Sequence, residues 1–468
     1  MHTKLRFDQI NRDQILDATL AHATGFLSEL DTRPVAIRPK IDQVAQLPDQ
    51  GGGAVAAIHE FNARFASQLS GSSGPRYFGF VTGGATPAAI AGDWLASVYD
   101  QNATGFGDSC TPLVEIEAVS MVRELLNLPD YFSGSFVSGA TMSNFVGLAI
   151  ARQWLGQQMD VDVAEQGAAA LGDIKVFTAT AHSSTVKALA MLGLGRRCVQ
   201  SIACLNQREA VDIDVLEQQL SLLEHSTSLP AVVVASAGTV NTADFDDLQA
   251  LCELKSKYHF WLHVDGAFGA FAACSPRHAH LVASIEHADS ITVDCHKWLN
   301  VPYDSALQFS RHQQLQLQVF QNYAVYLGTP TMDEPNFVHL TPENSRRFRA
   351  LPTWMTLMAY GKQGYREIVE RNCELAQLLT ERLSQSPRFD LLAPTHLNVV
   401  CFALRRDSVT ATMEETKSYL DRVRTDGKVF LTPTTYQNTA AIRAAICNWS
   451  TEAHDIDVTV HALHRCLA

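Results

Sequence analysis

The stretch Val293-Asp294-Cys295-His296-Lys297-Trp298 carries the strongest signal in this sequence. It begins where an apolar run, residues 290–293, ends, and that run has the length of a buried strand. Functional groups of a parallel sheet collect beyond the carboxyl ends of its strands, and Lys297 follows such an end. A lysine amine there can form an imine with an aldehyde group. A His-Lys pair alone is more often an ordinary surface feature. Whether Lys297 is a functional residue therefore depends on the other clusters in the sequence.

A second cluster, His263-Val264-Asp265-Gly266-Ala267-Phe268, follows the apolar run 260–264. An aspartate at this place can pair with a protonated ring nitrogen of a cofactor and keep the ring an electron acceptor. The alternative is an aspartate that caps a turn or the next helix, which is common. This cluster therefore indicates a cofactor site only in combination with Lys297.

A third cluster, Val137-Ser138-Gly139-Ala140-Thr141-Met142-Ser143-Asn144, follows a short predicted strand and opens a helix. Its small residues and hydroxyls can offer backbone N–H groups and side-chain donors to a phosphate at the helix N-terminus. It lacks both the Gly-Lys-Ser/Thr ending of a P-loop and the G-x-G-x-x-G pattern of dinucleotide-binding folds. A nucleotide-binding α/β protein is thereby disfavoured, although Gly and Ser also make plain turns.

Two further clusters follow predicted strands. Ala181-His182-Ser183-Ser184 comes after residues 175–179, and its imidazole can stack on a flat ring or move a proton, unless its serines only cap a helix. The segment 235–242 comes after the run 231–234 and contains the hydroxyl of Thr239. One crevice that collects phosphate donors, a ring stacker, an acid and a lysine is hard to explain by packing alone.

The pattern along the chain predicts an α/β protein. From about residue 78, short apolar runs alternate with helical segments, which is typical of βαβ units and a largely parallel sheet. We expect a large domain over residues 76–345 and a smaller C-terminal α+β domain over residues 346–468. Residues 1–75 are predicted to form helices without a core of their own. We expect this arm to pack on a partner subunit.

Composition and charge narrow the class of protein. The net charge of −13 argues against a nucleic acid or an anionic membrane as partner. Ten cysteines are scattered without a C-x-x-C pair, which is typical of reduced intracellular thiols. The polar N-terminus does not look like a signal peptide, and no apolar run reaches the ~18 residues of a membrane span. We expect a cytoplasmic protein that binds neither membrane nor metal.

Taken in order, these clusters resemble the group II PLP-dependent amino-acid decarboxylases, which include the aromatic-L-amino-acid, glutamate and histidine decarboxylases. The resemblance runs from about Tyr77 to Tyr365. The most specific part is His296-Lys297-Trp298 with an aspartate 32 residues upstream. Further matching stretches are residues 76–80, 111–117, 181–184 and 263–267, and more loosely 442–449.

The resemblance implies a fold, an assembly and a cofactor. The fold is type I, as in aspartate aminotransferase, with a mixed, mostly parallel seven-stranded sheet and a small C-terminal domain. The assembly is a homodimer with its sites at the interface. By position, Lys297 would hold pyridoxal 5′-phosphate (PLP) as a Schiff base, Asp265 would pair with the pyridine nitrogen and His182 would stack on the ring. The phosphate and the rest of the cofactor would be contacted by Gly139, Ala140, Thr141, His296, Thr239 and Ala267.

The implied reaction is decarboxylation of an L-amino acid to its amine through an external aldimine and a quinonoid carbanion. Family members bring a tyrosine from the partner's loop to protonate that carbanion, but residues 328–343 contain no tyrosine. Ungapped counting puts Phe337 at the tyrosine position, and other gap placements put His339 or Leu340 there. We favour an amine product, with His339, Tyr326 or water as proton donor. The alternatives are oxidation to an aldehyde, as in plant aromatic aldehyde synthases, or another fold-type-I lyase or aminotransferase reaction.

The substrate side chain is less determined by the sequence. An apolar wall would suit an aromatic or bulky aliphatic side chain. Arg76 can instead clamp an acidic side chain by a bidentate pair. The residues expected in the apolar wall are Tyr77, Phe78, Phe80, Trp94 and Phe106.

Overall fold

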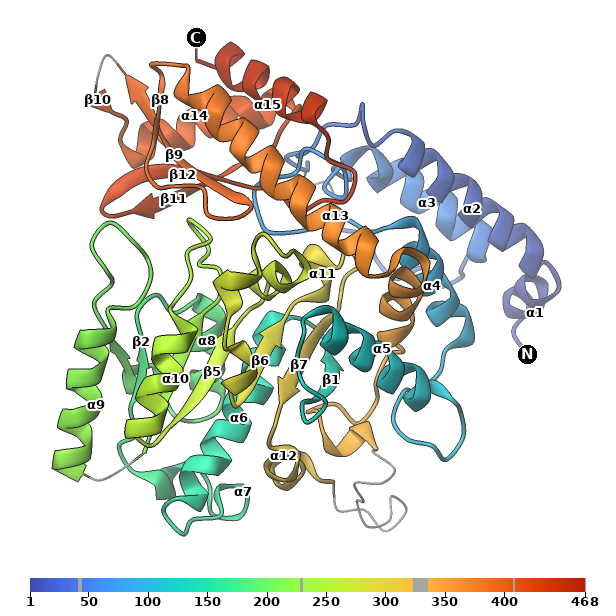
Figure 1. Ribbon diagram of the computed structural model, residues 1–468. Helices are drawn as coiled ribbons and strands as arrows, with labels where there is room; N and C mark the ends of the chain where they lie inside the picture. The colour runs from blue at the N-terminus through green and yellow to red at the C-terminus, as the bar shows by residue number, and fades with distance from the viewer. Residues whose placement is uncertain (41–43, 228–229, 323–335, 407–408, 468) are drawn as a thin grey trace.

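The computed structural model describes residues 1–40, 44–227, 230–322, 336–406 and 409–467. Its main body is built around a seven-stranded sheet with the strand order β1-β7-β6-β5-β4-β2-β3 (Figure 1). β2 pairs in parallel with β3 and β4, and the parallel pairing continues through β5 to β6, whereas β7 is antiparallel to both of its neighbours. The predicted mixed, mostly parallel sheet is confirmed. The strands are β1 (Ser133–Val137), β2 (Val176–Thr178), β3 (Val199–Ser201), β4 (Ala231–Ser236), β5 (Phe260–Asp265), β6 (Ser290–Val293) and β7 (Ala306–Ser310).

Both faces of this sheet are covered, as the continuous apolar character of its central strands requires. Along β4, Val232 and Val234 pack into a core with α6 and α8, whereas Val233 and Ala235 pack into the core on the opposite face. This alternation follows the two-residue period of a strand. The helices are α6 (Ala140–Gln157), α7 (Val163–Gln166) and α8 (Ser183–Met191) on one side, and α9 (Ile213–Thr227) and α10 (Leu248–Lys257) on the other.

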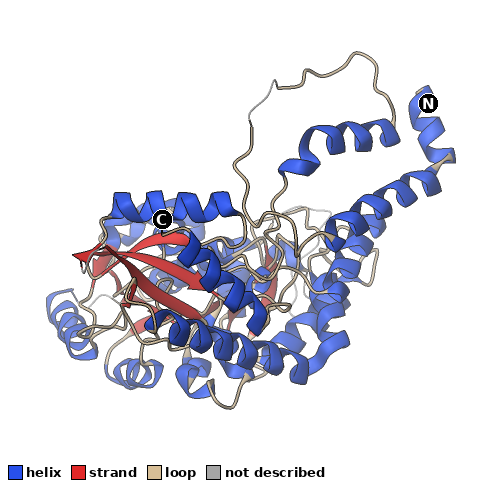
Figure 2. Cartoon of the chain, turned by 90° about the horizontal axis from the view of Figure 1, so that it is seen from above, coloured by secondary structure: helices blue, strands red, loops and turns tan. Residues whose placement is uncertain are grey.

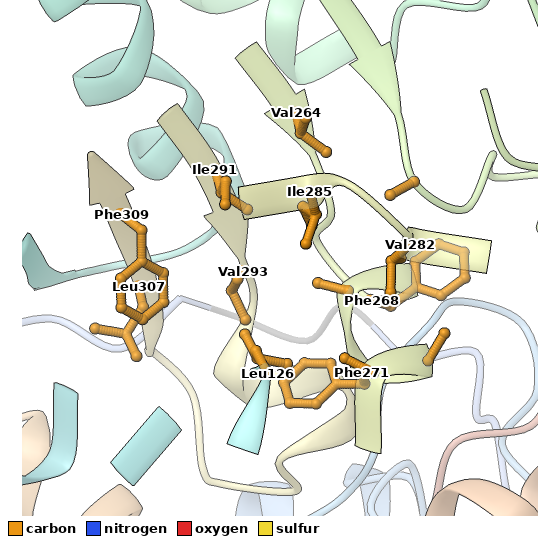
Figure 3. Close-up of a cluster of buried hydrophobic side chains, with 14 of the residues drawn as sticks. Leu126, Val264, Phe268, Phe271, Val282, Ile285, Ile291, Val293, Leu307 and Phe309 are labelled. Carbon is orange, nitrogen blue, oxygen red and sulfur yellow. The ribbon is translucent and has the colours of Figure 1, made fainter. Parts of the chain in front are cut away.

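The core below β5, β6 and β7 supports the strand ends that carry the site. Ile291 and Val293 of β6 point to the same side as Val264 and meet Phe268 and Phe271 from the segment that follows β5 (Figure 3). All five side chains are buried. Because protein interiors are packed about as densely as organic crystals, this cluster fixes the backbone that presents Asp265 and Lys297.

A second, smaller sheet forms a separate C-terminal domain. Its strands pair antiparallel in the order β10-β9-β12-β11, and β8 pairs with β9. The long helix α13 (Ala350–Ser384) runs between the domains, because its neighbours include α4 and α5 as well as β8, β9 and α15. The remaining elements named here are α4 (Pro87–Tyr99), α5 (Thr111–Leu125), β8 (Phe389–Leu391), β9 (Val399–Arg406), β10 (Val409–Thr410), α14 (Met413–Asp426), β11 (Thr432–Tyr436), β12 (Thr439–Ala445) and α15 (Ala453–Arg465).

Three N-terminal helices, α1 (Thr3–Ile10), α2 (Arg12–Ser28) and α3 (Ala54–Phe65), stand away from this body (Figure 2). No residue of the three is buried. Apolar side chains nevertheless recur along them, as predicted from the sequence, and are largely exposed: Leu5, Phe7, Ile10, Leu16, Leu20, Phe61 and Phe65. Among the helices described, none has the length and apolar character needed to cross a membrane.

Candidate active site

The candidate active site lies where β4, β5 and β6 end side by side. Asp265, the last residue of β5, is in register with Ser236 of β4 and Thr292 of β6. Lys297 follows β6 on the short helix α11 (Cys295–Trp298). The parallel register therefore brings Asp265 and Lys297 to one edge of the sheet, although 32 residues separate them along the chain.

A cavity of about 200 Å³ opens at this edge. Its wall contains five of the residues predicted from the sequence, which come from four separate segments of the chain. The cavity is also lined by Val81, Glu209, Asn241 and Phe268. The predicted residues in the wall are His182, Thr239, Asp265, Ala267 and Lys297.

The amine of Lys297 points into partly enclosed surroundings. Its Nζ lies 5.6 Å from the centre of the Phe268 ring and 3.8 Å from Oδ2 of Asp294. The Lys297 side chain is only 17% exposed. The lysine therefore has a carboxylate close enough to interact with its ammonium form and an apolar ring beneath it.

Asp294 connects Lys297 with the predicted phosphate-binding residues. Its Oδ2 accepts a hydrogen bond from the Ala140 backbone N–H at 3.2 Å. Its Oδ1 lies 2.9 Å from Nδ1 of His296, although the two atoms do not meet in hydrogen-bonding geometry. A Cβ atom placed on Gly139 would lie 3.5 Å from Cε1 of His296. The start of α6 and the His296 ring thus face each other, with Thr141 in the first turn of that helix.

Asp265 is held by two N–H donors. Asn144 Nδ2 donates to its Oδ2 at 3.1 Å, and the Ala267 backbone N–H donates to its Oδ1 at 3.3 Å. The aspartate is buried, yet it lines the cavity. The carboxylate is therefore fixed in orientation while still facing the space in which a ring would lie.

His182 precedes α8 and caps it, since its Nδ1 accepts from the Ser184 backbone N–H at 3.3 Å. The Ser184 hydroxyl lies 2.6 Å from the same nitrogen. Burial lowers the pKa of His182, and the negative charge of Asp265 only partly opposes that effect. The imidazole is consequently neutral at pH 7, with its proton on Nε2, which suits a ring that stacks on another flat ring.

Sequence reasoning missed Glu209, a nearly buried carboxylate in the cavity wall. Its Oε2 accepts from the hydroxyls of Thr239 at 2.6 Å and Thr242 at 2.8 Å, and its Oε1 accepts from Asn241 Nδ2 at 2.8 Å. These bonds fix the loop that carries Thr239. No local motif marks Glu209, because its partners lie about 30 residues further along the chain.

A second, larger cavity of about 680 Å³ contains most of the expected apolar wall. Tyr77, Phe80 and Trp94 line it together with the hydroxyls of Thr82 and Tyr303, which are 2.6 Å apart. The ring of Tyr303 also packs on His296, at 4.3 Å between centroids. Tyr303, which the sequence did not single out, therefore links this cavity to the Lys297 segment.

Two expectations about the substrate wall are wrong. Phe78 is fully buried in the core of the C-terminal domain, because its backbone pairs with Phe430 and its ring packs among that domain's strands and helices. Arg76 cannot clamp an acidic substrate, since its guanidinium is buried and already occupied. It donates to Asp455 Oδ1 at 2.6 Å and to two backbone carbonyls, those of Asp31 and Lys428.

The three residues aligned with the missing tyrosine are packed inside the subunit. Phe337, His339 and Leu340 are each at most 5% exposed. The guanidinium of Arg346 lies over the Phe337 ring at 4.9 Å, and His339 Nδ1 accepts from the Asn322 backbone N–H at 3.0 Å. Tyr323, Tyr326 and residues 328–335 lie outside the described residues.

Comparison with known proteins identifies the family to which a chain with this sheet and this lysine belongs. The pyridoxal-dependent decarboxylase conserved domain matches residues 36–405. The chain belongs to this family. It is therefore a PLP-dependent carboxy-lyase that decarboxylates an L-amino acid.

Individual relatives agree with that assignment. The chain is similar to an aromatic-L-amino-acid decarboxylase of Bacillus atrophaeus, with 26% identity over 95% of this chain and 92% of the relative. It is also similar to a 3,4-dihydroxyphenylacetaldehyde synthase of Aedes aegypti, with 26% identity over 88% and 80% of the two chains. Among solved structures, Oryza sativa TDC with PLP and tryptamine matches with a TM-score of 0.90 at 21% identity, covering 100% and 99% of the chains. That structural match confirms the expected fold.

Proposed function

We propose that Lys297 binds PLP covalently through its amine and that Asp265 keeps a proton on the pyridine nitrogen. The observation that carries this proposal is the cavity in which Lys297, Asp265 and His182 meet. Its residues fit the cofactor: Asn144 holds the Asp265 carboxylate in the wall that Lys297 also lines, and His182 offers a neutral ring. When bound, PLP supplies a sink for the electrons released as the bond to the carboxylate breaks.

The remaining cofactor contacts belong to the same proposal. Gly139, Ala140 and Thr141 at the N-terminus of α6 would hold the phosphate together with His296, because helix N-termini favour anions. Thr239 and Ala267 would lie against the ring, as both line the cavity. Bound in this way, the cofactor would be held at its phosphate and along its ring.

The direct test is the visible spectrum of the purified enzyme with PLP. Wild-type protein should be yellow, and borohydride reduction should fix the cofactor to one peptide that contains Lys297. Lys297→Ala should lose both signals, while Lys255→Ala, which removes a lysine outside this cavity, should keep them. A colourless wild-type protein, or a fixed peptide without Lys297, would contradict the proposal.

We propose an aromatic or bulky apolar amino acid as substrate. The wall formed by Tyr77, Phe80 and Trp94 supports this choice, and so does the occupation of Arg76 by Asp455. The Bacillus atrophaeus relative, named as an aromatic-L-amino-acid decarboxylase, points the same way. Product analysis by mass spectrometry over the twenty common amino acids tests it, and selective turnover of glutamate or aspartate would contradict it.

We propose that the enzyme is a homodimer in which α1, α2 and α3 pack on the second copy. The exposed apolar side chains of these helices support this assembly, together with an apolar cavity of about 750 Å³ between α2 and α3. The double substitution Leu16→Asp and Leu20→Asp should yield monomers in analytical ultracentrifugation. Leu222→Asp, which changes a still more exposed leucine on α9, should leave the dimer intact.

We propose the amine as product, with the proton for the α-carbon supplied from Tyr326 or water in place of a loop tyrosine. His339 is a weaker candidate, because it is buried and burial lowers its pKa, so that its ring is neutral. Quantifying amine, aldehyde and H₂O₂ after one substrate equivalent decides the point. Stoichiometric peroxide would contradict the amine.

We also propose a cytoplasmic location and a chain divided into an N-terminal helical arm over residues 1–75, a large PLP-binding domain over residues 76–345 and a small C-terminal domain over residues 346–468. All ten cysteines are free thiols, which is typical of a reducing compartment. The separate cores of the two sheets support the division between the last two units. Cell fractionation tests the location, and limited proteolysis with mass spectrometry tests the boundaries.

A further inference from the structure

Asn144 joins Asp265 and His182, two residues that line the candidate active-site cavity. It lies on α6, is fully buried and donates from Nδ2 both to Asp265 Oδ2 at 3.1 Å and to the Ser184 hydroxyl at 3.0 Å. That hydroxyl lies 2.6 Å from His182 Nδ1. We propose that Asn144 is a positioning residue that sets the orientation of Asp265 and, through Ser184, of His182. This inference rests on the proposed roles of those two residues.

The surrounding hydrogen bonds allow only one orientation of the Asn144 amide. Its Oδ1 accepts from His263 Nε2 at 2.8 Å and from the Thr292 hydroxyl at 2.9 Å. Both Nδ2 protons are then directed at Asp265 and Ser184, so every donor and acceptor of the amide is used. A rotated amide would turn its oxygen towards the Asp265 carboxylate, which only accepts hydrogen bonds, and would lose these bonds.

His263 can donate from Nε2 because its other ring nitrogen, Nδ1, can accept from the Ser290 hydroxyl. The indole N–H of Trp261 donates to the Ser290 hydroxyl at 3.0 Å, and that hydroxyl lies 2.7 Å from His263 Nδ1. The Ser290 hydroxyl can therefore donate to Nδ1, and Nε2 carries the ring proton because the Asn144 oxygen that it meets can only accept. Burial lowers the pKa of His263 to about 4, so the ring stays neutral at pH 7.

The consequence for Asp265 is specific. Asn144 is the side-chain donor to Oδ2, whereas the Ala267 backbone N–H serves Oδ1. Without the amide, the carboxylate can turn about its Cβ–Cγ bond, and Ser184 loses a partner at the same time. Because a hydrogen bond to a charged group is lost, a variant without the amide should bind PLP more weakly than the wild type, by on the order of 10- to 100-fold.

The test compares PLP dissociation constants and visible spectra of the holoenzyme at pH 6.0 and 8.5. Asn144→Asp keeps the shape of the side chain but places a second carboxyl against Asp265. At pH 8.5 the two carboxylates repel each other, and affinity should fall on the order of 10- to 100-fold. At pH 6.0 one shared proton restores the hydrogen bond, so most of the loss should disappear. Other titratable or charged groups around the pair are His263 on β5, His182 before α8, Asp294 and Lys297 at α11, and Arg443 on β12.

Two further variants complete the design. Asn144→Ala should weaken PLP binding at both pH values, because no proton can replace the missing amide. Asn398→Asp changes an equally buried asparagine that donates to the Ile446 carbonyl in the C-terminal domain, and it should bind PLP as the wild type does.

The outcomes separate this inference from the proposed function. If wild-type protein shows the cofactor band but both Asn144 variants bind PLP within twofold of it at each pH, Asn144 only packs the core and the inference fails. If wild-type protein shows no cofactor band, the proposed function fails and this inference fails with it. A loss confined to the Asn144 variants, with recovery of Asn144→Asp at low pH, supports the positioning role.

Discussion

Arg346 and Glu115 form an ion pair in which both side chains are at most 2% exposed. The guanidinium donates to the two carboxylate oxygens at 2.7 and 2.9 Å and also to the carbonyls of Ala103 and Phe136. Glu115 in turn accepts the Phe136 N–H at 3.0 Å. The pair thereby ties the segment before α13 to α5 and to β1 of the main sheet.

Removing one partner of this pair should destabilise the protein strongly. Glu115→Gln leaves a buried guanidinium without its counter-charge, and the free energy of unfolding should fall by about 3–5 kcal/mol. The paired substitution Glu115→Leu with Arg346→Met should recover much of that loss, since no buried charge remains. Urea unfolding followed by circular dichroism measures both. Arg465→Met, which breaks an exposed pair with Asp426, should leave the midpoint almost unchanged, and a comparable loss there would contradict the argument.

Stability should depend on pH through His263. Burial lowers its pKa to about 4, whereas a histidine in the unfolded chain binds a proton below about pH 6.5. The unfolded state therefore binds more protons between these values, and stability falls as pH drops from about 6.5 towards 4. His263→Gln should be less stable at pH 7 but should lose less on acidification than wild type. Equal slopes of unfolding free energy against pH would exclude His263 as the source.

Arg76 should contribute to the stability of the fold and not to the preference for aromatic over acidic substrates. Its guanidinium is buried against Asp455 and two carbonyls, so Arg76→Met leaves an unpaired buried carboxylate and should cost about 3–5 kcal/mol of unfolding free energy. The ratio of kcat/KM for an aromatic over an acidic amino acid should stay within about threefold, because no substrate contact is removed. A shift of tenfold or more in that ratio would restore Arg76 to the substrate site.

Phe337→Tyr tests whether Phe337 occupies the position of the proton-donating tyrosine, as ungapped counting suggests, or is a packed core residue, as the structure shows. If Phe337 occupied the position of the proton-donating tyrosine, this substitution should increase amine formation. Because the ring is 2% exposed beneath the Arg346 guanidinium, we expect the added hydroxyl to lower the melting temperature and leave the ratio of amine to aldehyde unchanged. Differential scanning fluorimetry measures the melting temperature, and product analysis measures the ratio of amine to aldehyde. Phe320→Tyr on α12 (Gln313–Phe320) serves as a control at a half-buried phenylalanine.

Local patterns predicted the sheet and the order of groups along its edge. Each apolar run that ends before a polar residue marks a strand end, and successive parallel strands present those ends on one side. Asp265, Lys297 and His182 could be selected on that basis. The same reasoning failed for Phe78, because an aromatic residue beside a motif gives no sign of which domain's core receives it.

The sequence by itself determined the α/β class and singled out the lysine and the aspartate of the candidate site, since strand period and strand ends are local properties of the backbone. Only the tertiary structure decided which polar groups meet. Asn144 reaches Asp265 across 121 positions, and Arg76 reaches Asp455 across 379. Which residues become such partners depends on how the crossovers and domains pack. A buried polar group then pairs with the partner that this packing supplies, because leaving the group unpaired would cost much free energy.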